Sequence, residues 1–436
     1  MDLHVNKTLG LRGEAVPPSS KSQSIRGLLF ALLTKGTSKF CNILDSDDTQ
    51  TAMQVCTALG AKINLRHNLL TVYSQGVPLN TCPTAINTGN SGITTRFILP
   101  LLGLRQNYNI PVILDCGEQM RERPIDSLVC ALRNLGMNIQ YVTQDGRLPI
   151  AVTGQLQGGV TTVEGITSQY LSALLIGLPC AENASLITVK NLHERPYINM
   201  TLAWLQQQGI AYKHWSSANM DIFKIIGNQQ YKSMQTTIQG DFSSASCLIA
   251  AATLLPGTVE LYGLNRSDLQ GDQRLISILQ DLGAEITVTQ DKIRIIGNRP
   301  LIGSRIDAND IPDLLPALAV IATFARGKTE IYNVKQARLK ETDRIHSMTE
   351  GLRKMGARIA EHPDGMIVYP SNLHGALVSG FGDHRTVMAL TVAGMIADGT
   401  TIITDGEAIN KTYPRFVETI QALGGRVSFI RELLSS

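Results

Sequence analysis

Residues 279–286, LQDLGAEI, combine the last turn of a helix, a glycine and the first residues of a strand. Gly283 stands where a helix C-cap needs a positive φ angle, which glycine adopts with little strain. Five more segments share this form: CTALGAKI (56–63), LRNLGMNI (132–139), LQQQGIAY (205–212), LRKMGARI (352–359) and IQALGGRV (420–427). The six glycines, at 60, 136, 209, 283, 356 and 424, are spaced 76, 73, 74, 73 and 68 residues apart. This spacing predicts six copies of one α/β unit.

Each copy holds a second passage from helix to strand. In LLPGTVELYGL (254–264) and FARGKTEIYNV (324–334), an apolar helix passes through a glycine into an alternating strand. A helix followed by a strand is common in α/β proteins, but six occurrences at nearly fixed spacing favour a true repeat. Six copies divide into three and three, and TIQGDFSS (237–244) lies between the third and the fourth. We therefore predict two α/β domains of three units each.

Composition limits the function classes. The 436 residues are 43% apolar and 17% charged, with a net charge of +3 and no run of basic residues, which disfavours a nucleic-acid binder. The seven cysteines are scattered and never spaced C-x-x-C, so neither a disulfide framework nor a zinc site is predicted. MDLHVNKTLG (1–10) lacks the apolar region of a secretory signal, and runs such as LLPALAVIATFA (314–325) are too short to span a bilayer. We expect a cytoplasmic protein.

Polar or charged residues precede the apolar run of the first helix in every copy. Capping alone explains the start at 240–246, but not Lys21, Arg26 or the His384–Arg385 pair, because basic residues at a helix N-terminus oppose the helix dipole. We infer that a multiply anionic ligand offsets these charges. The six starts are SSKSQSIR (19–26), NSGITTR (90–96), TSQY (167–170), GDFSSAS (240–246), IPDLL (311–315) and GDHRT (382–386).

Other basic residues lie at similar junctions. MRERPI (120–125) and LHERPYINM (192–200) each place an arginine just before a proline, where an extended chain turns into a helix. RLKETDRIHSM (338–348) is the densest charge cluster, and on a helix its Lys340 and Arg344 would share a face. An ordinary solvated helix start is the alternative interpretation of that cluster.

The segments SKSQSIR, GNSGITTR, RERPI, TSQYLSALL, IPD, LKETDR, GDHR and NKTYP, in this order, resemble the motifs of the enolpyruvyl transferases along nearly the whole chain. KETDR together with DHR points to the branch whose acceptor is shikimate 3-phosphate. The resemblance implies an α/β fold of two domains, each of three βαβαββ units, with the active site in the interdomain cleft. One domain would span 20–239 and the other 1–19 plus 240–436, with crossovers near 19–20 and 239–241.

The resemblance also implies the reaction. The enolpyruvyl group of phosphoenolpyruvate moves to the 5-hydroxyl of shikimate 3-phosphate by addition and elimination, and phosphate leaves. Asp313 would take the hydroxyl proton, Glu341 would handle the methylene proton, and Lys21 would bridge both substrates. His384 would lie near the leaving phosphate. For Asp313 the alternative is N-capping of the following helix, and for His384 it is a structural role at its helix start.

The binding residues follow from the same resemblance. Arginine suits both anions, because its planar fork binds two oxygens at once. The residues that would bind shikimate 3-phosphate are Lys21, Ser22, Arg26, Thr167, Ser168, Gln169, Arg195, Asp313, Gln336 and Lys340. Those that would bind phosphoenolpyruvate are Lys21, Gly92, Arg123, Gln169, Arg344, Arg385 and Lys411. We expect these small molecules as the partners, with no cofactor, metal, nucleic acid or membrane, and a monomeric chain.

Three departures from the family pattern concern the acceptor. Glu194 stands where a serine is usual, and because a carboxylate repels phosphate we expect Glu194 to point away and to leave that contact to Arg195. Gln336 replaces an asparagine, which puts its contact in question. Thr167 replaces a serine and keeps the hydroxyl.

A fourth departure concerns inhibition. In glyphosate-sensitive relatives the helix of residues 90–97 starts like NAGTAMRP, whereas here it reads NSGITTRF. Ile93 takes the place of the threonine and Phe97 that of the proline. We expect these changes to shift Gly92 and to narrow the space beside phosphoenolpyruvate, so that glyphosate inhibits poorly.

Other functions stay open. The sister branch, whose acceptor is UDP-N-acetylglucosamine, usually carries a cysteine five residues before the arginine of the RP motif; here that position is Glu118, and Cys116 is two residues away. A phosphate-ligand binding protein, or a relative of the RNA 3'-phosphate cyclases, would come from a different class. The small net charge and the lack of stacking aromatics count against RNA, and a binder would not need Asp313 and Glu341 together.

Overall fold

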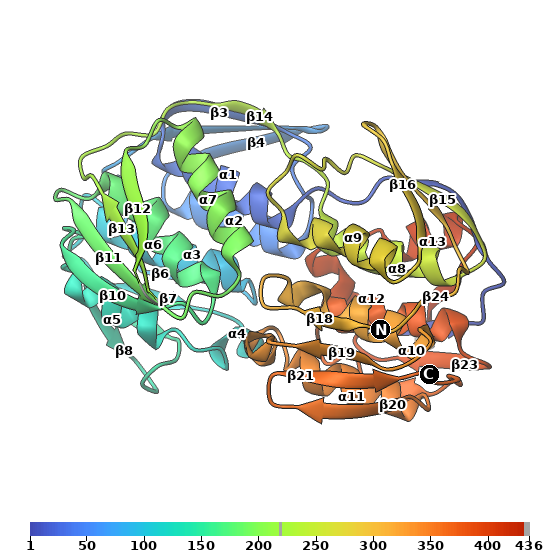
Figure 1. The fold of residues 1–436 in the computed structure, drawn as a ribbon. Coiled ribbons are helices and arrows are strands. Elements are labelled where there is room, and N and C mark those ends of the chain that lie inside the picture. Colours follow the sequence, from blue (N-terminus) through green and yellow to red (C-terminus); the bar gives the residue numbers. More distant parts are fainter. Residues whose placement is uncertain (218–219, 431–436) are drawn as a thin grey trace, which may run out of the picture. The chain divides into compact units, whose positions relative to one another are not determined.

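The computed structural model describes residues 1–217 and 220–430, and its chain divides into two compact units. We call Lys21–Ile238 the inserted unit, and Met1–Ser20 together with Gln239–Ser436 the discontinuous unit. Figure 1 labels the elements of both units. Each unit contains three repeats of one α/β pattern: a strand, a buried helix, a second strand, an outer helix and two further strands.

The inserted unit contains the first three repeats. The first consists of β14 (Gln235–Thr237), α1 (Lys21–Leu33), β3 (Lys35–Cys41), α2 (Asp47–Ala58), β4 (Lys62–Arg66) and β5 (Leu69–Gln75). The second consists of β6 (Ala85–Asn87), α3 (Gly92–Leu101), β7 (Val112–Asp115), α5 (Asp126–Asn134), β8 (Asn138–Tyr141) and β9 (Ile150–Thr153). The third consists of β10 (Val160–Glu164), α6 (Ser168–Gly177), β11 (Ser185–Lys190), α7 (Arg195–Gln207), β12 (Tyr212–Ser217) and β13 (Met220–Ile225).

The discontinuous unit contains the other three. The fourth repeat consists of β2 (Leu11–Ala15), α8 (Phe242–Leu254), β15 (Gly257–Tyr262), α9 (Arg274–Asp281), β16 (Glu285–Val288) and β17 (Lys292–Ile296). The fifth consists of β18 (Arg305–Asp307), α10 (Leu315–Phe324), β19 (Thr329–Tyr332), α11 (Arg344–Lys354), β20 (Arg358–His362) and β21 (Gly365–Tyr369). The sixth consists of β22 (Leu377–Val378), α12 (His384–Ile396), β23 (Thr400–Ile403), α13 (Phe416–Ala422), β24 (Arg426–Ile430) and β1 (Asp2–Asn6).

Short helical turns join these elements. They are α4 (Glu118–Arg121), η1 (Leu102–Leu104), η2 (Leu178–Cys180), η3 (Gly271–Gln273), η4 (Pro312–Leu314), η5 (Lys335–Leu339) and η6 (Gly406–Lys411). Two of them, η4 and η5, lead into helices of the fifth repeat and carry predicted site residues.

Within residues 1–217 and 220–430, all six sheets have four strands and the same topology. In the fifth repeat, β18 runs parallel to β19, and β21 runs antiparallel to both β19 and β20. A parallel pair needs a crossover connection, which α10 provides here. The other five sheets repeat this order, so the prediction of a two-domain α/β fold with six repeated units is confirmed.

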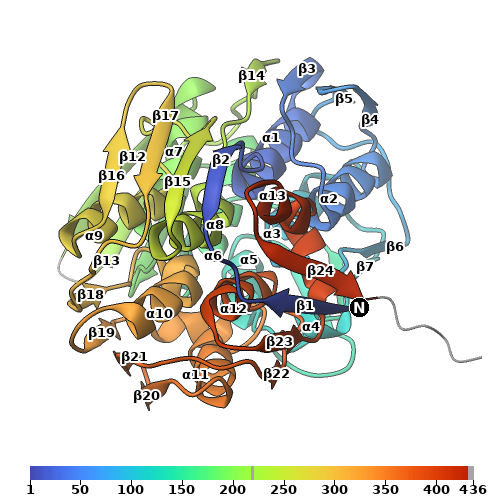
Figure 2. The same cartoon turned by 90° about the vertical axis from the view of Figure 1, so that its right-hand side faces the viewer.

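Strands distant in sequence complete three of the sheets. β2 pairs in parallel with β15, and β14 pairs in parallel with β3. β1 lies between β23 and β24 and pairs antiparallel with both, which Figure 2 shows as a dark blue strand between two red ones. The N-terminal strands therefore belong to sheets of the discontinuous unit.

One helix of each repeat lies inside the core and the other covers it. In α10, nine of the ten residues are buried, whereas α9 buries only Leu275, Ile276 and Leu279. The six glycines at the ends of the outer helices all have positive φ angles, from 73° to 105°, so the predicted left-handed conformation after each helix is confirmed. Over the residues that the structure describes, no helix has both the length and the apolar character that a membrane span requires.

Candidate active site

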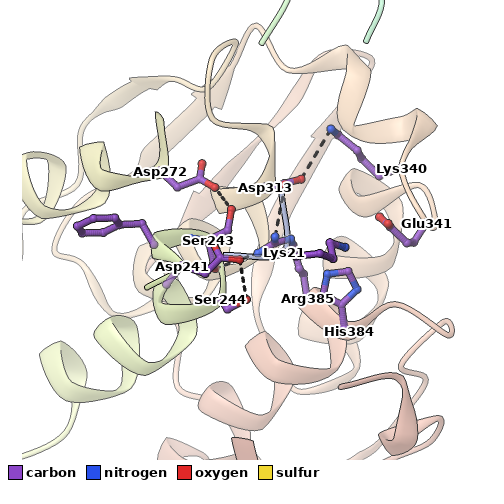
Figure 3. Close-up of polar contacts among 12 residues, drawn as sticks. Lys21, Asp241, Ser243, Ser244, Asp272, Asp313, Lys340, Glu341, His384 and Arg385 are labelled. Atoms are coloured by element: carbon purple, nitrogen blue, oxygen red, sulfur yellow. Dashed lines mark hydrogen bonds and ion pairs between the residues drawn. The ribbon is translucent and has the colours of Figure 1, made fainter. Parts of the chain in front are cut away.

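Three helix N-termini meet in the discontinuous unit. α8 begins at Phe242, α12 begins at His384, and Asp313 lies in the turn η4 just before α10. From the first turn of α12, Arg385 Nη1 donates to the carbonyl oxygen of Ser243 at 2.9 Å, and Arg385 Nη2 lies 3.4 Å from Asp313 Oδ2 (Figure 3). Helix N-termini present backbone N–H groups and partial positive charge, so this meeting point favours an anionic ligand.

Arg344, the first residue of α11, contacts three carboxylates at this point. Its Nη1 donates to Asp313 Oδ1 at 2.6 Å and its Nη2 to Glu341 Oε2 at 2.6 Å. Its Nε donates to Asp383 Oδ2 at 2.7 Å, and the Arg344 side chain is only 1% exposed. Because a guanidinium holds carboxylate oxygens at fixed angles, Arg344 fixes the positions of the two carboxylates that the sequence predicts to move protons.

Three more cations approach the same carboxylates. Lys340 Nζ lies 3.7 Å from Asp313 Oδ1, and Lys411 Nζ lies 3.9 Å from Glu341 Oε1. Arg385 is the third. We call the four cations and three carboxylates the Arg344 cluster: Asp313, Lys340, Glu341, Arg344, Asp383, Arg385 and Lys411. Every side chain in the cluster is at most 17% exposed, and the cations exceed the carboxylates by one.

These cations determine the protonation state of Asp313. Burial alone raises the pKa of a carboxyl, but Arg385, Lys340 and Arg344 outweigh burial and hold the pKa of Asp313 well below its usual range, while Glu341 opposes them. Burial also lowers the pKa of Arg344, yet Asp383, Glu341 and Asp313 hold that pKa well above its usual value. At neutral pH Asp313 is therefore an ionised proton acceptor beside a permanent positive charge.

One local prediction about this cluster is wrong. Lys340 and Arg344 do not share a helix face, because α11 begins only at Arg344 and residues 340–343 are not helical. Asp343 is the N-cap of α11, and its Oδ1 accepts from the backbone N–H of His346 at 3.0 Å. The side chains of Lys340 and Glu341 reach the Arg344 cluster from the connection after η5.

Two further predicted residues lie nearby in the same unit. His384 is 1% exposed, and its Nδ1 lies 3.5 Å from Asp383 Oδ1. Figure 3 shows its ring next to Arg385. Gln336, in η5, is 3% exposed and donates through Nε2 to the carbonyl oxygen of Asn309 at 2.7 Å. That bond holds Gln336 to the loop before η4.

The start of α8 is a capping structure, as the sequence indicated. Asp241 Oδ1 accepts from the backbone N–H of Ser243 at 2.9 Å, and Asp241 Oδ2 accepts from Ser244 Oγ at 3.3 Å. The hydroxyl of Ser243 donates to the carboxylate of Asp272 (Figure 3). These bonds hold the backbone whose carbonyl oxygen receives Arg385.

In the inserted unit, the basic residues of α1 are paired. Lys21, the first residue of the helix, lies 3.0 Å from Asp48 Oδ2. Arg26 is 1% exposed, and burial lowers its pKa to about 9 against the opposing effect of Tyr197. Arg26 donates at 3.0 to 3.1 Å to Thr201 Oγ1 and to the carbonyl oxygens of Ser22 and Tyr197. Arg26 thus fastens α1 to α7.

Gly92 and Arg123 lie against each other in this unit. A Cβ at position 92 would lie 2.4 Å from Arg123 Nη1 and 2.9 Å from its Cζ, so no side chain fits without displacing the guanidinium. Arg96 Nη1 would lie 3.2 Å from the same Cβ. Arg96 also donates to Gln169 Oε1 at 2.7 Å, which links α3 to the start of α6. The sequence prediction included Gly92, Arg123 and Gln169 but missed Arg96, although Arg96 ends the quoted NSGITTR segment.

At the N-terminus of α6, the structure corrects the prediction for Glu194. Glu194 does not point away: its Oε2 accepts from Ser168 N at 3.0 Å, from Ser168 Oγ at 2.7 Å and from Thr167 Oγ1 at 3.4 Å. Arg195 forms a two-point contact with Asp221, at 2.7 and 3.1 Å. We call Thr167, Ser168, Glu194, Arg195 and Asp221 the Glu194 cluster.

Sequence reasoning missed four acidic partners of predicted residues. Asp383 could have been found, because an aspartate directly before a helix is a strong N-cap signal and its Oδ1 indeed accepts from Arg385 N at 2.8 Å. Asp48, Asp221 and Asp272 carry no comparable local signal. Among the described residues, no group of three or more His, Cys, Asp or Glu side chains could hold a metal ion.

Known proteins resemble this chain along nearly its whole length. A family model described as EPSP synthase (3-phosphoshikimate 1-carboxyvinyltransferase) matches residues 5–420. The 3-phosphoshikimate 1-carboxyvinyltransferase of Acetivibrio thermocellus is 42% identical over 411 residues, which cover 94% of this chain and 96% of that protein. The protein of the same name from Methanococcus maripaludis is 36% identical, with 98% and 100% covered.

Two solved structures share the fold. EPSP synthase from Acinetobacter baumannii superposes with a TM-score of 0.81 at 23% identity, covering 98% of this chain and 100% of its own. The enolpyruvyl transferase NikO from Streptomyces tendae superposes with a TM-score of 0.79 at 16% identity, covering 98% of each chain. At these identities the two structures support the architecture alone.

Proposed function

The chain belongs to the EPSP synthase family, and on this premise we propose which of its residues carry out the family's reaction. As a 3-phosphoshikimate 1-carboxyvinyltransferase, it transfers the enolpyruvyl group of phosphoenolpyruvate to shikimate 3-phosphate in aromatic amino acid biosynthesis. One observation supports the residue assignment most: Asp313 and Glu341 each lie 2.6 Å from the guanidinium of Arg344. A pair of fixed carboxylates suits a reaction that must move two protons.

Phosphoenolpyruvate brings a carboxylate and a phosphate, and both need positive charge. The excess cation of the Arg344 cluster supports binding in the discontinuous unit, and the backbone of Gly92 beside the guanidinium of Arg123 supports binding in the inserted unit. We assign to this substrate Lys21, Gly92, Arg123, Gln169, Arg344, Arg385 and Lys411.

In the addition step, Glu341 gives a proton to the methylene carbon of phosphoenolpyruvate, and Asp313 takes the proton of the 5-hydroxyl. The 5-oxygen bonds to the central carbon. In the elimination step, the new methyl group returns a proton to Glu341, and the electron pair of that C–H bond forms the carbon–carbon double bond. The bond between the central carbon and the phosphate oxygen breaks, and phosphate leaves with the electron pair of this bond and takes up the proton that Asp313 had accepted. Because Arg344 contacts both carboxylates, the same fixed cation stabilises the negative charge of Asp313 and of Glu341 whenever either is ionised.

Shikimate 3-phosphate must place its 5-hydroxyl beside Asp313. Lys340 lies 3.7 Å from Asp313 Oδ1, so a hydroxyl group that contacts this lysine lies within reach of the base. We assign to the acceptor Lys21, Ser22, Arg26, Thr167, Ser168, Gln169, Arg195, Asp313, Gln336 and Lys340. We place His384 near the leaving phosphate, on the basis of its position beside Arg385 at the start of α12.

The sister activity on UDP-N-acetylglucosamine is not favoured. The curated relatives carry the name of the shikimate 3-phosphate enzyme. Cys116, the nearest cysteine to the position expected in the sister branch, is 2% exposed, and burial raises its pKa to about 11. A covered, protonated thiol is a poor nucleophile.

We extend the proposal to the setting of the enzyme, a cytoplasmic monomer. The small net charge of +3 disfavours a nucleic-acid partner. We also propose weak inhibition by glyphosate. Phe97, which lies in α3, replaces a proline of sensitive relatives. The centroid of its ring lies 5.1 Å from Cζ of Arg26 in α1. This contact ties the helix that carries Gly92 to α1.

The test of the activity uses two acceptors. The protein is mixed with phosphoenolpyruvate and either shikimate 3-phosphate or UDP-N-acetylglucosamine, and released phosphate is measured. We expect release with shikimate 3-phosphate only. Release with the nucleotide sugar alone would assign the chain to the sister activity, and binding without release would make it a non-catalytic phosphate binder.

A further inference from the structure

Glu194 is a buried carboxylate directed at the start of a neighbouring helix. It is 1% exposed and directly precedes α7, with φ 58° and ψ 39° in the left-handed region. Residues other than glycine, asparagine and aspartate rarely adopt that region, so its surroundings must hold the backbone there. The side chain crosses to α6, where it accepts from Ser168 and Thr167.

The donors that Glu194 uses are the donors that a phosphate would use. They are the backbone N–H and the hydroxyl of Ser168, at 3.0 and 2.7 Å, and the hydroxyl of Thr167, at 3.4 Å. They stand at the N-terminus of a ten-residue helix, where negative charge is stabilised. A carboxylate presents two oxygens to such donors, and a phosphate presents three, so the two groups compete for the same place.

The neighbouring arginine is neutralised in a similar way. Arg195 Nη1 and Nη2 donate to the two carboxylate oxygens of Asp221, which is 3% exposed and also accepts from Ser216 at 2.9 Å. His214 Nε2 lies 2.9 Å from the same carboxylate. The hydroxyls and the arginine that we assign to shikimate 3-phosphate therefore face carboxylates of the chain itself.

We propose that Glu194 is an internal substitute for the 3-phosphate of the acceptor, and that it determines how tightly the acceptor binds. The inference rests on the proposed function, in which Thr167, Ser168 and Arg195 receive shikimate 3-phosphate. Bound phosphate must displace the Glu194 carboxylate from α6, because two anions cannot share these donors at hydrogen-bond distance. Glu194 thus lowers the affinity for a phosphorylated acceptor and reduces the preference for it over an acceptor without phosphate.

Glu194→Gln tests this inference with little change in shape. Glutamine keeps an acceptor oxygen for Ser168 and removes the negative charge. We expect the KM and the Kd for shikimate 3-phosphate to fall about tenfold, while kcat and the KM for phosphoenolpyruvate stay within about twofold. With shikimate, which lacks the phosphate, kcat/KM should not rise. Binding is also measured by titration calorimetry, so the result does not depend on turnover.

Three variants accompany it. Glu194→Ser removes the carboxylate entirely and should give the same direction of change if the glutamine variant folds poorly. Asp221→Asn releases Arg195 from its partner and should lower the KM for shikimate 3-phosphate by about threefold. Glu182→Gln removes an exposed carboxylate from the same unit and should leave both KM values unchanged.

A gain in affinity cannot arise from a general loss of structure, so the expected result separates this role from a merely structural one. Unchanged or weaker binding of shikimate 3-phosphate in both Glu194 variants would overturn the inference. So would an equal gain with shikimate. The proposed function has its own outcome, because wild-type enzyme that forms no product from phosphoenolpyruvate and shikimate 3-phosphate would refute the activity whatever the variants bind.

Discussion

The Arg344 cluster and the Glu194 cluster both join arginine to carboxylates, but in different proportions. In the first, four cations face three carboxylates, and Arg344 alone contacts all three. In the second, the carboxylates of Glu194 and Asp221 contact one arginine, three hydroxyl groups and the ring of His214. The first cluster therefore keeps an excess of positive charge for incoming anions. In the second cluster, carboxylates of the chain itself already occupy the donors.

This difference indicates where substrate charge matters most. In the Arg344 cluster the carboxylate of Asp313 is ionised because the cations outweigh burial, so it can act as a proton acceptor. In the Glu194 cluster, the carboxylate of Asp221 is likewise stabilised: burial raises its pKa, but Arg195, His214 and Ser216 lower it to about 2. In the Glu194 cluster this negative charge repels the phosphate of shikimate 3-phosphate. Substitutions should therefore abolish function in one cluster and tune affinity in the other.

The largest effect is expected for Arg344→Gln. This change leaves Asp313, Glu341 and Asp383 close together without their shared cation, and breaking a buried ion pair from one side costs about 3–5 kcal/mol. We expect that loss in the free energy of unfolding, measured with urea, together with loss of detectable turnover. Arg299→Gln is the control, because Arg299 pairs with Glu285 on the surface and both side chains are about half exposed.

A surface pair contributes about 0–1 kcal/mol, so the control should unfold close to wild type. If Arg344→Gln were as stable as Arg299→Gln and still active, the Arg344 cluster would be neither a structural nor a catalytic centre. The contrast between the two clusters would then fail.

Asp313→Asn should reduce kcat by about 10²–10⁴-fold, the range for a lost general base. Asparagine keeps the shape of the side chain but cannot accept the 5-hydroxyl proton. The KM for phosphoenolpyruvate should change little. Asp291→Asn, on the exposed connection between β16 and β17, is the matched control. A kcat within threefold of wild type for Asp313→Asn would show that another residue is the general base.

Gly92→Ala should raise the KM for phosphoenolpyruvate about tenfold, or about 1.4 kcal/mol. The added Cβ would lie 2.4 Å from Arg123 Nη1 and so displaces the guanidinium that we assign to this substrate. The KM for shikimate 3-phosphate should stay within about twofold. Equal changes in both KM values would instead indicate a general distortion of α3.

Lys340→Met should shift the acid limb of the kcat profile to higher pH. Lys340 is one of the cations that hold the pKa of Asp313 well below its usual range, so its removal raises that pKa. The base is active when ionised, and activity is lost as the pH falls through its pKa. Raising the pKa therefore moves this loss to higher pH. An acid limb at the wild-type pH would show that Lys340 does not control the pKa of Asp313.

The smallest effect concerns glyphosate. We expect wild-type enzyme to need much more glyphosate for half inhibition than sensitive relatives do, at equal phosphoenolpyruvate. Ile93→Thr should lower the glyphosate concentration for half inhibition by a few-fold, because threonine is smaller than isoleucine at the position after Gly92. Strong inhibition of the wild type at concentrations typical of sensitive enzymes would contradict this expectation.

Local patterns were enough to predict the six repeated units. The six glycines after the outer helices predicted the repeats, and Asp241 was correctly interpreted as a cap, because both features depend on neighbours within a few residues. Family motifs named the residues of the Arg344 cluster except Asp383, and the catalytic roles of those residues remain predictions. The mutual contacts could not be predicted, since Asp313 and Asp383 lie 31 and 39 residues from Arg344 in sequence.

The orientation of Glu194 shows the same limit. Repulsion from phosphate was a sound expectation for the occupied site, yet its partner Ser168 lies 26 residues away on another helix. The helix N-terminus of α6 attracts a carboxylate, and only the three-dimensional structure identifies which one that is.

The central claim, that Glu341 and Asp313 move the protons of an addition and elimination, is tested most directly in D2O. The enzyme converts phosphoenolpyruvate and shikimate 3-phosphate there, and mass spectrometry measures deuterium in the methylene group of the product. The account predicts deuterium in the product of the wild type, because the methyl intermediate gains one solvent-derived proton before it loses one. It predicts little product from Glu341→Gln. Unlabelled product formed at full rate by both enzymes would contradict it.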